Sequence, residues 1–113
     1  MIYKICSREL WNNAVKEGRF AGAPIDLQDG FIHFSTAKQV KETAAKHFAG
    51  QDDLLLIEFD ESEFGDDLKW EVSRGGDLFP HLYAELPPDA AKLVNPLPLS
   101  NSGEHLFPPT VVE

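Results

Sequence analysis

The chain has 113 residues, which suits one domain with a single core, so we expect one domain over residues 1–113. Apolar residues make up 42% of the chain and charged residues 26%, the composition of a globular domain rather than a disordered one. The net charge of -9 disfavours nucleic acid and anionic membranes as partners, so an anionic ligand would have to be held by local groups.

The first predicted strand covers residues 2–6 (IYKIC). The N-terminal sequence lacks the features of a signal peptide, and no apolar stretch is long enough to cross a membrane, so we expect a cytosolic protein. Cys6 alternates with Ile2 and Lys4, which indicates a small core residue rather than a nucleophile. A single cysteine also excludes an internal disulfide and every multi-cysteine zinc motif.

A helix is predicted over residues 8–17, with Ser7 as its N-cap and Gly18 at its end. The residues expected on its buried face are Leu10, Trp11, Ala14 and Val15. Residues 19–29 contain glycine and proline breaks and predict a loop that ends in a turn at Asp29 and Gly30. A short strand is expected over residues 31–35.

Thr36 and Gln39 have the spacing of a capping box, and apolar residues then repeat at helical spacing as far as Gly50. These features predict the second helix. Residues 53–60 (DLLLIEFD) form a continuous apolar run between acidic ends, which predicts a central strand buried on both faces. Residues 61–67 are expected to form an acidic turn.

The remaining chain predicts short strands separated by turns. Residues 68–73 and 81–86 alternate between apolar and polar side chains, with a flexible loop at residues 74–77, and a last strand is expected within residues 90–97. The proline-rich tail, residues 98–113, is expected to lie on the surface. Together these elements predict the α+β class, with two helices covering a mainly antiparallel sheet.

The segment GFIHFSTAKQV, residues 30–40, carries the first candidate site. Alternation directs Ile32 and Phe34 to the core and places His33 and Ser35 on the opposite face. A helix N-terminus at Thr36 would favour an anion beside them, which predicts a grip on a ribose and a phosphate. The alternative is that the hydroxyls only cap the helix and His33 bonds a neighbouring carbonyl group.

The segment FPHLYAE, residues 79–85, repeats this arrangement, with His81 and Tyr83 on the face opposite Leu82. If the strands of His33 and His81 are neighbours, the two histidines line a common cleft, and Tyr83 suits stacking on a planar ligand. The alternative for Tyr83 is an amphipathic side chain at a sheet edge. Spacing alone does not decide whether the strands are adjacent.

Glu71 is a candidate general base, and Arg74 is a candidate partner for a ligand carboxylate or phosphate. The commoner explanation for such residues is a solvated face beside a glycine loop. A metal site built from His33, His81 and a carboxylate would lack any short ligand motif, so no metal is expected.

Four segments in this order resemble family 952 of the bacterial domains of unknown function: DGFIHFSTA at 29–37, DLLLIE at 53–58, LKWE at 68–71 and FPHLY at 79–83. The resemblance implies an ADP-ribosyltransferase-like fold, a compact α+β arrangement of two small sheets around an NAD-binding cleft. It leaves the activity open, because the family is defined without one.

In that superfamily a strand histidine, followed two residues later by a hydroxyl, grips the NAD riboses, and a second strand supplies a histidine or tyrosine that packs on the nicotinamide. The resemblance therefore implies NAD as a substrate, bound by residues of both segments and of the glycine loop: His33, Ser35, Thr36, Arg74, His81 and Tyr83.

Active transferases of the superfamily often add a late glutamate. Here Glu85 follows Tyr83 closely, and no glutamate lies in a well-placed strand after it. Transfer of ADP-ribose would then rest on the candidate catalytic residues His33, His81 and Glu71, with histidines in the leading role as in the related RNA 2'-phosphotransferases. The second hypothesis is a noncatalytic module that binds a small molecule or a protein partner through the same cleft.

Overall fold

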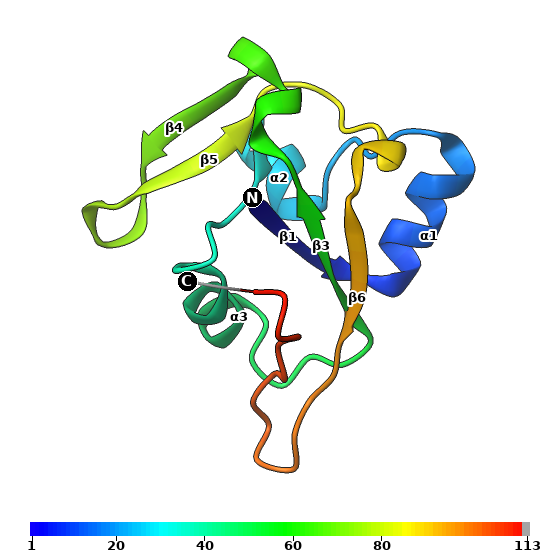
Figure 1. Ribbon diagram of the computed structural model, residues 1–113, viewed down its shortest axis with the longest axis vertical. Helices are drawn as coiled ribbons and strands as arrows, with labels where there is room; N and C mark the ends of the chain where they lie inside the picture. The colour runs from blue at the N-terminus through cyan, green and yellow to red at the C-terminus, as the bar shows by residue number, and fades with distance from the viewer. Residues whose placement is uncertain (112–113) are drawn as a thin grey trace.

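The computed structural model describes residues 1–111, and at Arg74 it describes the backbone alone. Within these residues the chain forms two small antiparallel sheets and three α-helices, which confirms the predicted α+β class (Figure 1). The first sheet has the order β1-β3-β6, formed by Ile2–Ser7, Leu54–Phe59 and Leu93–Leu97. The second has the order β2-β5-β4, formed by Ile32–His33, Leu78–Leu82 and Leu68–Val72.

The central strand of the first sheet is β3, which pairs with β1 on one side and β6 on the other. Leu55, Ile57 and Phe59 pack into one hydrophobic cluster and Leu54 and Leu56 into another, so both faces of β3 are covered. The prediction of a strand buried on both faces is confirmed. In Figure 1, α1 lies on one side of this sheet and α3 on the other.

Helix α1 spans Arg8–Glu17, as predicted. The Ser7 hydroxyl accepts a hydrogen bond from the Leu10 N–H, and Gly18 ends the helix in the left-handed conformation, with φ 78°. Trp11 and Ala14 face the core, whereas the expected burial of Val15 is wrong, because its side chain is 54% exposed.

Residues 19–29 are not a loop throughout, because Pro24–Asp29 forms the short helix α2. Pro24 occupies its first turn, where the missing N–H costs nothing, and Gly30 ends it with φ 86°. The proline and glycine breaks that predicted a loop therefore mark the two ends of a helix.

The second predicted helix begins later than expected. Helix α3 spans Val40–His47, and Thr36 instead opens a turn in which its carbonyl oxygen accepts from the N–H groups of Gln39 and Val40. Val40 and Ala44 are buried against the second face of the first sheet. None of the helices in the part of the chain that the structure describes is long and apolar enough to cross a bilayer.

Two further expectations need correction. Strand β5 ends at Leu82, so the alternation through residues 83–86 does not continue the strand, although Leu86 forms an isolated bridge with Phe20. The C-terminal tail is not confined to the surface: it folds back along α3, and Phe107 and Val111 pack against the second hydrophobic cluster (Figure 1). Residues 112–113 of the predicted tail lie outside the described residues.

The two sheets meet at the segment after β2. The backbone N–H of Tyr3 donates to the Ser35 carbonyl over 2.8 Å, and the N–H of Ser35 donates to the Tyr3 carbonyl over 2.9 Å. On its other side the segment continues the pairing with β5, because the Phe34 N–H donates to the Pro80 carbonyl over 3.0 Å. The predicted strand over residues 31–35 is thus divided between the two sheets.

Candidate functional site

His33 and His81 are direct partners across the antiparallel strands β2 and β5. Directly opposed residues project from the same face of a sheet, and the two imidazole rings lie 5.5 Å apart between centroids. The strands that carry the two candidate histidines are therefore adjacent, which the sequence alone left open.

Both histidines line a cavity of about 530 Å³ at the junction of the two sheets. Its walls come from β1, helix α2, the segment around β2, helix α3 with Phe48, and the β4–β5 hairpin. The lining includes Tyr3, Lys4, Asp29, Ser35, Thr43, His47 and Phe79. Of the predicted binding residues, the structure brings His33, Ser35 and His81 together here.

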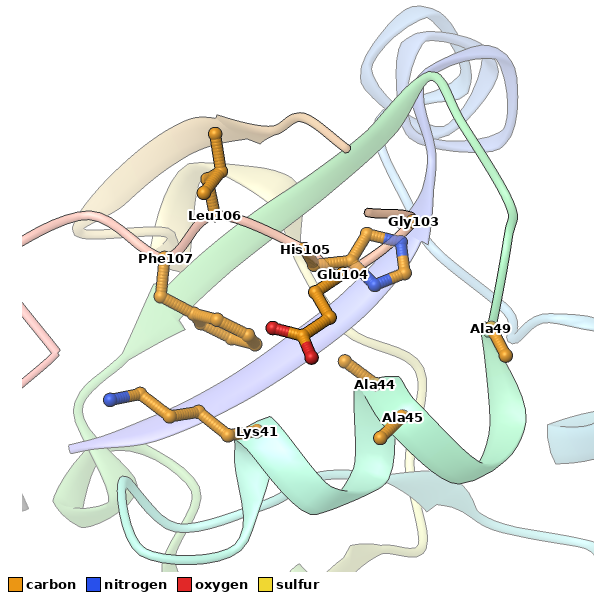
Figure 2. A pocket seen from close by; sticks show the side chains of 9 residues that line it. All are labelled: Lys41, Ala44, Ala45, Ala49, Gly103, Glu104, His105, Leu106 and Phe107. Carbon is orange, nitrogen blue, oxygen red and sulfur yellow. The ribbon is translucent and has the colours of Figure 1, made fainter. Parts of the chain in front are cut away.

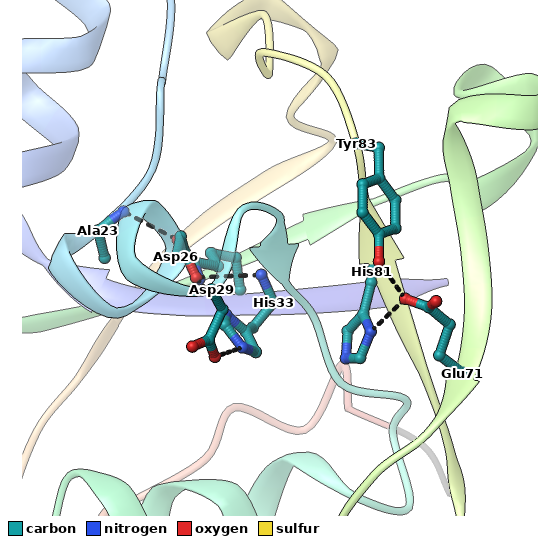
Figure 3. A network of polar contacts seen from close by, with 8 residues as sticks. Ala23, Asp26, Asp29, His33, Glu71, His81 and Tyr83 are labelled. Atoms are coloured by element: carbon teal, nitrogen blue, oxygen red, sulfur yellow. Dashed lines mark hydrogen bonds and ion pairs between the residues drawn. The ribbon is translucent and has the colours of Figure 1, made fainter.

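His33 is held between two carboxylates (Figure 3). Its Nδ1 lies 2.6 Å from Oδ1 of Asp26 and its Nε2 lies 2.9 Å from Oδ2 of Asp29. Each ring nitrogen of His33 therefore has a carboxylate oxygen as its partner. The alternative interpretation, in which His33 bonds a neighbouring carbonyl group, gives way to this pair of carboxylates.

Asp26 in turn belongs to a buried ion pair. Its carboxylate lies 2.8 Å from Nζ of Lys4 and also accepts from the backbone N–H groups of Ala23 and His33. Burial would raise the pKa of Asp26, but the hydrogen bond from His33 and the charge of Lys4 outweigh it and lower the pKa to about 2. Burial lowers the pKa of Lys4, and Asp26 opposes that shift.

His81 is held by a different carboxylate. Its Nδ1 lies 2.9 Å from Oε1 of Glu71, which also accepts a hydrogen bond of 2.7 Å from the Tyr83 hydroxyl (Figure 3). The hydrogen bonds from Tyr83 and His81 lower the pKa of Glu71, and the same bond raises the pKa of Tyr83. Glu71 therefore orients a histidine, and it is absent from the residues that line the cavity.

The Phe31 side chain packs against the rings of His81 and Tyr83. Its ring stacks on His81 with 4.0 Å between centroids and an interplanar angle of 27°, and it lies 5.3 Å from the ring of Tyr83. Tyr83 is not among the residues that line the cavity, and its hydroxyl donates to Glu71, so the predicted stacking of Tyr83 on a planar ligand stays a prediction.

Ser35 and Thr36, the two hydroxyl residues after His33, make different contacts. The Ser35 side chain is buried and lies 2.9 Å from the Thr43 hydroxyl, so neither Ser35 nor Thr36 serves as a side-chain cap of α3. The backbone N–H of Thr36 donates to the Gln39 side chain over 3.1 Å. The helix N-terminus expected at Thr36 for anion binding is therefore displaced along the chain.

Three further residues that the sequence analysis considered have different outcomes. The Arg74 side chain lies outside the described residues, so its predicted contact with a phosphate or carboxylate stays a prediction. Glu85 forms an exposed ion pair of 3.1 Å with Arg19. Cys6 is buried, and burial raises the pKa of its thiol to about 12, in agreement with a core residue rather than a nucleophile.

Sequence reasoning missed the residues that hold the site in place. Lys4 lies in the first strand, and Asp26 lies in the segment that was predicted as a loop. Their contact joins residues 22 positions apart, which local sequence patterns do not reveal. The available signal was a lysine at an inward position of the first strand, between Ile2 and Cys6. No group of three or more His, Cys, Asp or Glu side chains among the described residues is arranged to hold a metal ion.

A second cavity, also of about 530 Å³, lies between α3 and the C-terminal tail (Figure 2). Small residues of α3, among them Ala44 and Ala45, form one wall, and Glu104, His105 and Phe107 of the tail form the other. Nε2 of His105 also lies 2.8 Å from the Gln51 carbonyl oxygen, which connects the tail to the segment between α3 and β3. None of the predicted site residues lies in this cavity.

Comparison with known proteins identifies the family. A crystal structure of protein CC0527 from Caulobacter crescentus is similar to this chain with a TM-score of 0.93 and 45% sequence identity, over 97% of this chain and 96% of that chain. The crystal structure of a double mutant of CC0527 gives the same values. A solution NMR structure of CC0527 gives a TM-score of 0.83 and 48% identity, over 91% and 89% of the two chains.

None of the proteins with curated descriptions matches the chain significantly. The family model described as "Protein of unknown function (DUF952)" matches residues 5–94. This match confirms the family that the four sequence segments resembled, while the likeness to ADP-ribosyltransferases stays a prediction. The chain belongs to the DUF952 family.

Proposed function

We propose that the cavity between the two sheets binds NAD or an ADP-ribose-like ligand, with His33, Ser35 and His81 in contact with it. The observation that carries the proposal is the direct pairing of His33 with His81 at the wall of a cavity of about 530 Å³. Small-molecule sites typically have volumes of about 300–1,000 Å³ and a few convergent polar groups in a mostly apolar lining.

The polar groups of the cavity suit a ribose. Asp29 lines the cavity and supplies carboxylate oxygens that accept hydrogen bonds from hydroxyl groups, while the Ser35 hydroxyl can donate or accept. The apolar side chains of Ile5, Phe48 and Phe79 suit the flat rings of such a ligand. In this proposal the Arg74 side chain supplies the contact with a phosphate group.

Calorimetric titration of NAD and of ADP-ribose into the protein tests this proposal. We expect heat of binding with the wild type and at least a tenfold loss of affinity in His33→Ala. The matched control is His105→Ala, which removes an imidazole from the other cavity and should leave the affinity unchanged. No heat with either ligand, or equal affinities for His33→Ala and the wild type, would contradict the proposal.

Transfer of ADP-ribose would take place at the same site. Glu85 pairs with Arg19, and the carboxylate in the cavity, Asp29, is engaged by His33. The geometry therefore favours binding over glycosidic cleavage, which needs a group that stabilises an oxocarbenium-like centre. Release of nicotinamide during incubation with NAD distinguishes a transferase from a noncatalytic binding module, because the module binds without turnover.

A further inference from the structure

We propose that Nε2 of His81 accepts a hydrogen bond from a hydroxyl group of the ligand, and that Glu71 is the positioning residue that keeps this nitrogen unprotonated. The inference rests on the proposed function and deepens it, because it states which ligand chemistry the His81 wall recognises. It also replaces the predicted role of Glu71 as a general base.

Glu71 determines which nitrogen of His81 carries the proton. Oε1 of Glu71 lies 2.9 Å from Nδ1 of His81 and 2.7 Å from the Tyr83 hydroxyl. These two hydrogen bonds lower the pKa of Glu71, so at neutral pH its carboxylate is ionised and can only accept. The neutral ring of His81 must then carry its proton on Nδ1, which leaves the lone pair on Nε2.

The surroundings of His81 direct that lone pair. The residue is 5% exposed and the Phe31 ring covers one face of the imidazole, so the ring is held in one orientation. Figure 3 shows the second ring nitrogen pointing away from Glu71, toward α3. Thr43 and His47 of α3 line the same cavity as His81, so Nε2 faces the space in which a ligand would lie.

The two histidines therefore differ in what they can offer. Both nitrogens of His33 already have a carboxylate oxygen as their partner, Asp26 for Nδ1 and Asp29 for Nε2. His81, with its proton on Nδ1 toward Glu71, presents Nε2 to the cavity as an acceptor. A fully ionised phosphate has no proton to donate, so the contact at His81 calls for a hydroxyl group, such as that of a ribose.

Nitrogen NMR of protein labelled with ¹⁵N at its histidines tests this directly, because the two neutral tautomers have different spectra. At about pH 8, where an ordinary imidazole is neutral, we expect wild-type His81 to be protonated on Nδ1 and unprotonated on Nε2. Addition of ADP-ribose should shift the Nε2 signal. In Glu71→Gln the fixed tautomer should be lost and the affinity for ADP-ribose should fall at least tenfold.

Glu63→Gln is the matched control, since the Glu63 side chain is 39% exposed, as is that of Glu71, and it pairs with Lys92 outside the cavity. It should change neither the His81 spectrum nor the affinity. A proton on Nε2 in the wild type, an Nε2 signal unmoved by bound ADP-ribose, or an unchanged tautomer and affinity in Glu71→Gln would each overturn the inference. Absence of any binding would instead overturn the proposed function and, with it, the ligand contact assigned to Nε2.

Discussion

At the scale of single residues, the buried pair of Lys4 and Asp26 is asymmetric. Asp26 keeps other donors if Lys4 is removed, namely Nδ1 and the backbone N–H of His33 and the N–H of Ala23. The Lys4 side chain is 5% exposed, and among the described residues its ammonium group pairs with Asp26. The two halves of the ion pair should therefore differ in what their loss costs.

We expect Asp26→Asn to lower the free energy of unfolding by about 3–5 kcal/mol, because it leaves a buried charge without its counterion. Lys4→Met should cost less, about 1–3 kcal/mol, because the carboxylate retains its other hydrogen bonds. Urea unfolding at neutral pH measures both values. Lys92→Met, which breaks an exposed pair with Glu63, is the control and should cost less than about 1 kcal/mol. A larger cost for Lys4→Met than for Asp26→Asn would contradict the asymmetry.

The residues that face the cavity were more predictable than those that hold them. Alternation along the strand placed His33 on the face opposite Ile32 and Phe34, and the structure buries both apolar residues. Strand alternation is a local rule, so it can be read from a few residues. The partner of His33 could not be inferred in the same way, because Asp26 lies in a helix that glycine and proline breaks concealed.

At the scale of elements, Gln39 joins the start of α3 to the second sheet. Its Oε1 accepts from the Thr36 N–H over 3.1 Å, and its Nε2 donates to the Leu78 carbonyl over 2.8 Å. The sequence pattern of a capping box was thus half correct: the reach back to Thr36 exists, but the helix begins at Val40. The same side chain links two walls of the cavity.

Gln39→Ala should therefore lower the free energy of unfolding by about 1–2 kcal/mol through the loss of two hydrogen bonds. Gln39→Glu keeps an acceptor for Thr36 and loses the donor to Leu78, so its cost should lie between those of Gln39→Ala and the wild type. Thermal and urea unfolding provide the measurement, with Gln28→Ala on the exposed face of α2 as the control. Equal stability of Gln39→Ala and Gln28→Ala would show that the link is not formed in solution.

The elements that the sequence predicted best are those defined by local signals. Helix α1 has a side-chain cap at one end and a glycine at the other, and its bounds agree with the prediction. The prediction placed the strand at residues 81–86, whereas β5 ends at Leu82, because the alternation of apolar and polar residues continues beyond the strand. After Leu82 the chain no longer pairs with β4, and Leu86 pairs with Phe20 instead. Pairing with distant strands, rather than alternation, decides where such a strand ends.

At the scale of the whole molecule, the site depends on long-range pairing that a single sequence does not encode visibly. The pairing of His33 with His81 and the contact of Asp26 with Lys4 each join distant segments. The sequence predicted the α+β class and two strands with polar faces, but only the structure shows that these strands are neighbours. The contact of Asp26 with Lys4 should be visible in how the stability of the protein depends on pH in acid.

Because the pKa of Asp26 is about 2 in the fold and 3.8 as an ordinary carboxyl, its ionised form is favoured by folding. Its contribution is present in full above the unfolded-state pKa and is lost as the pH falls toward the folded-state pKa. From 1.36 kcal/mol per pKa unit, that contribution is on the order of 2 kcal/mol. Urea unfolding between about pH 6 and about pH 2.5 should show a steeper loss of stability in the wild type than in Asp26→Asn. Parallel curves would contradict the assignment.

Strand β1 has no hairpin partner, since its neighbours are Ser35 on one edge and β3 on the other. The strand that carries Lys4 is therefore synthesised before both of its backbone partners, and its pairing with β3 forms only after the chain has been made through that strand. Such non-local pairing requires the closure of long loops, which slows folding. Until then an apolar strand with a lysine at its centre remains unpaired, and the side chain that anchors the site also interrupts a segment otherwise prone to aggregate.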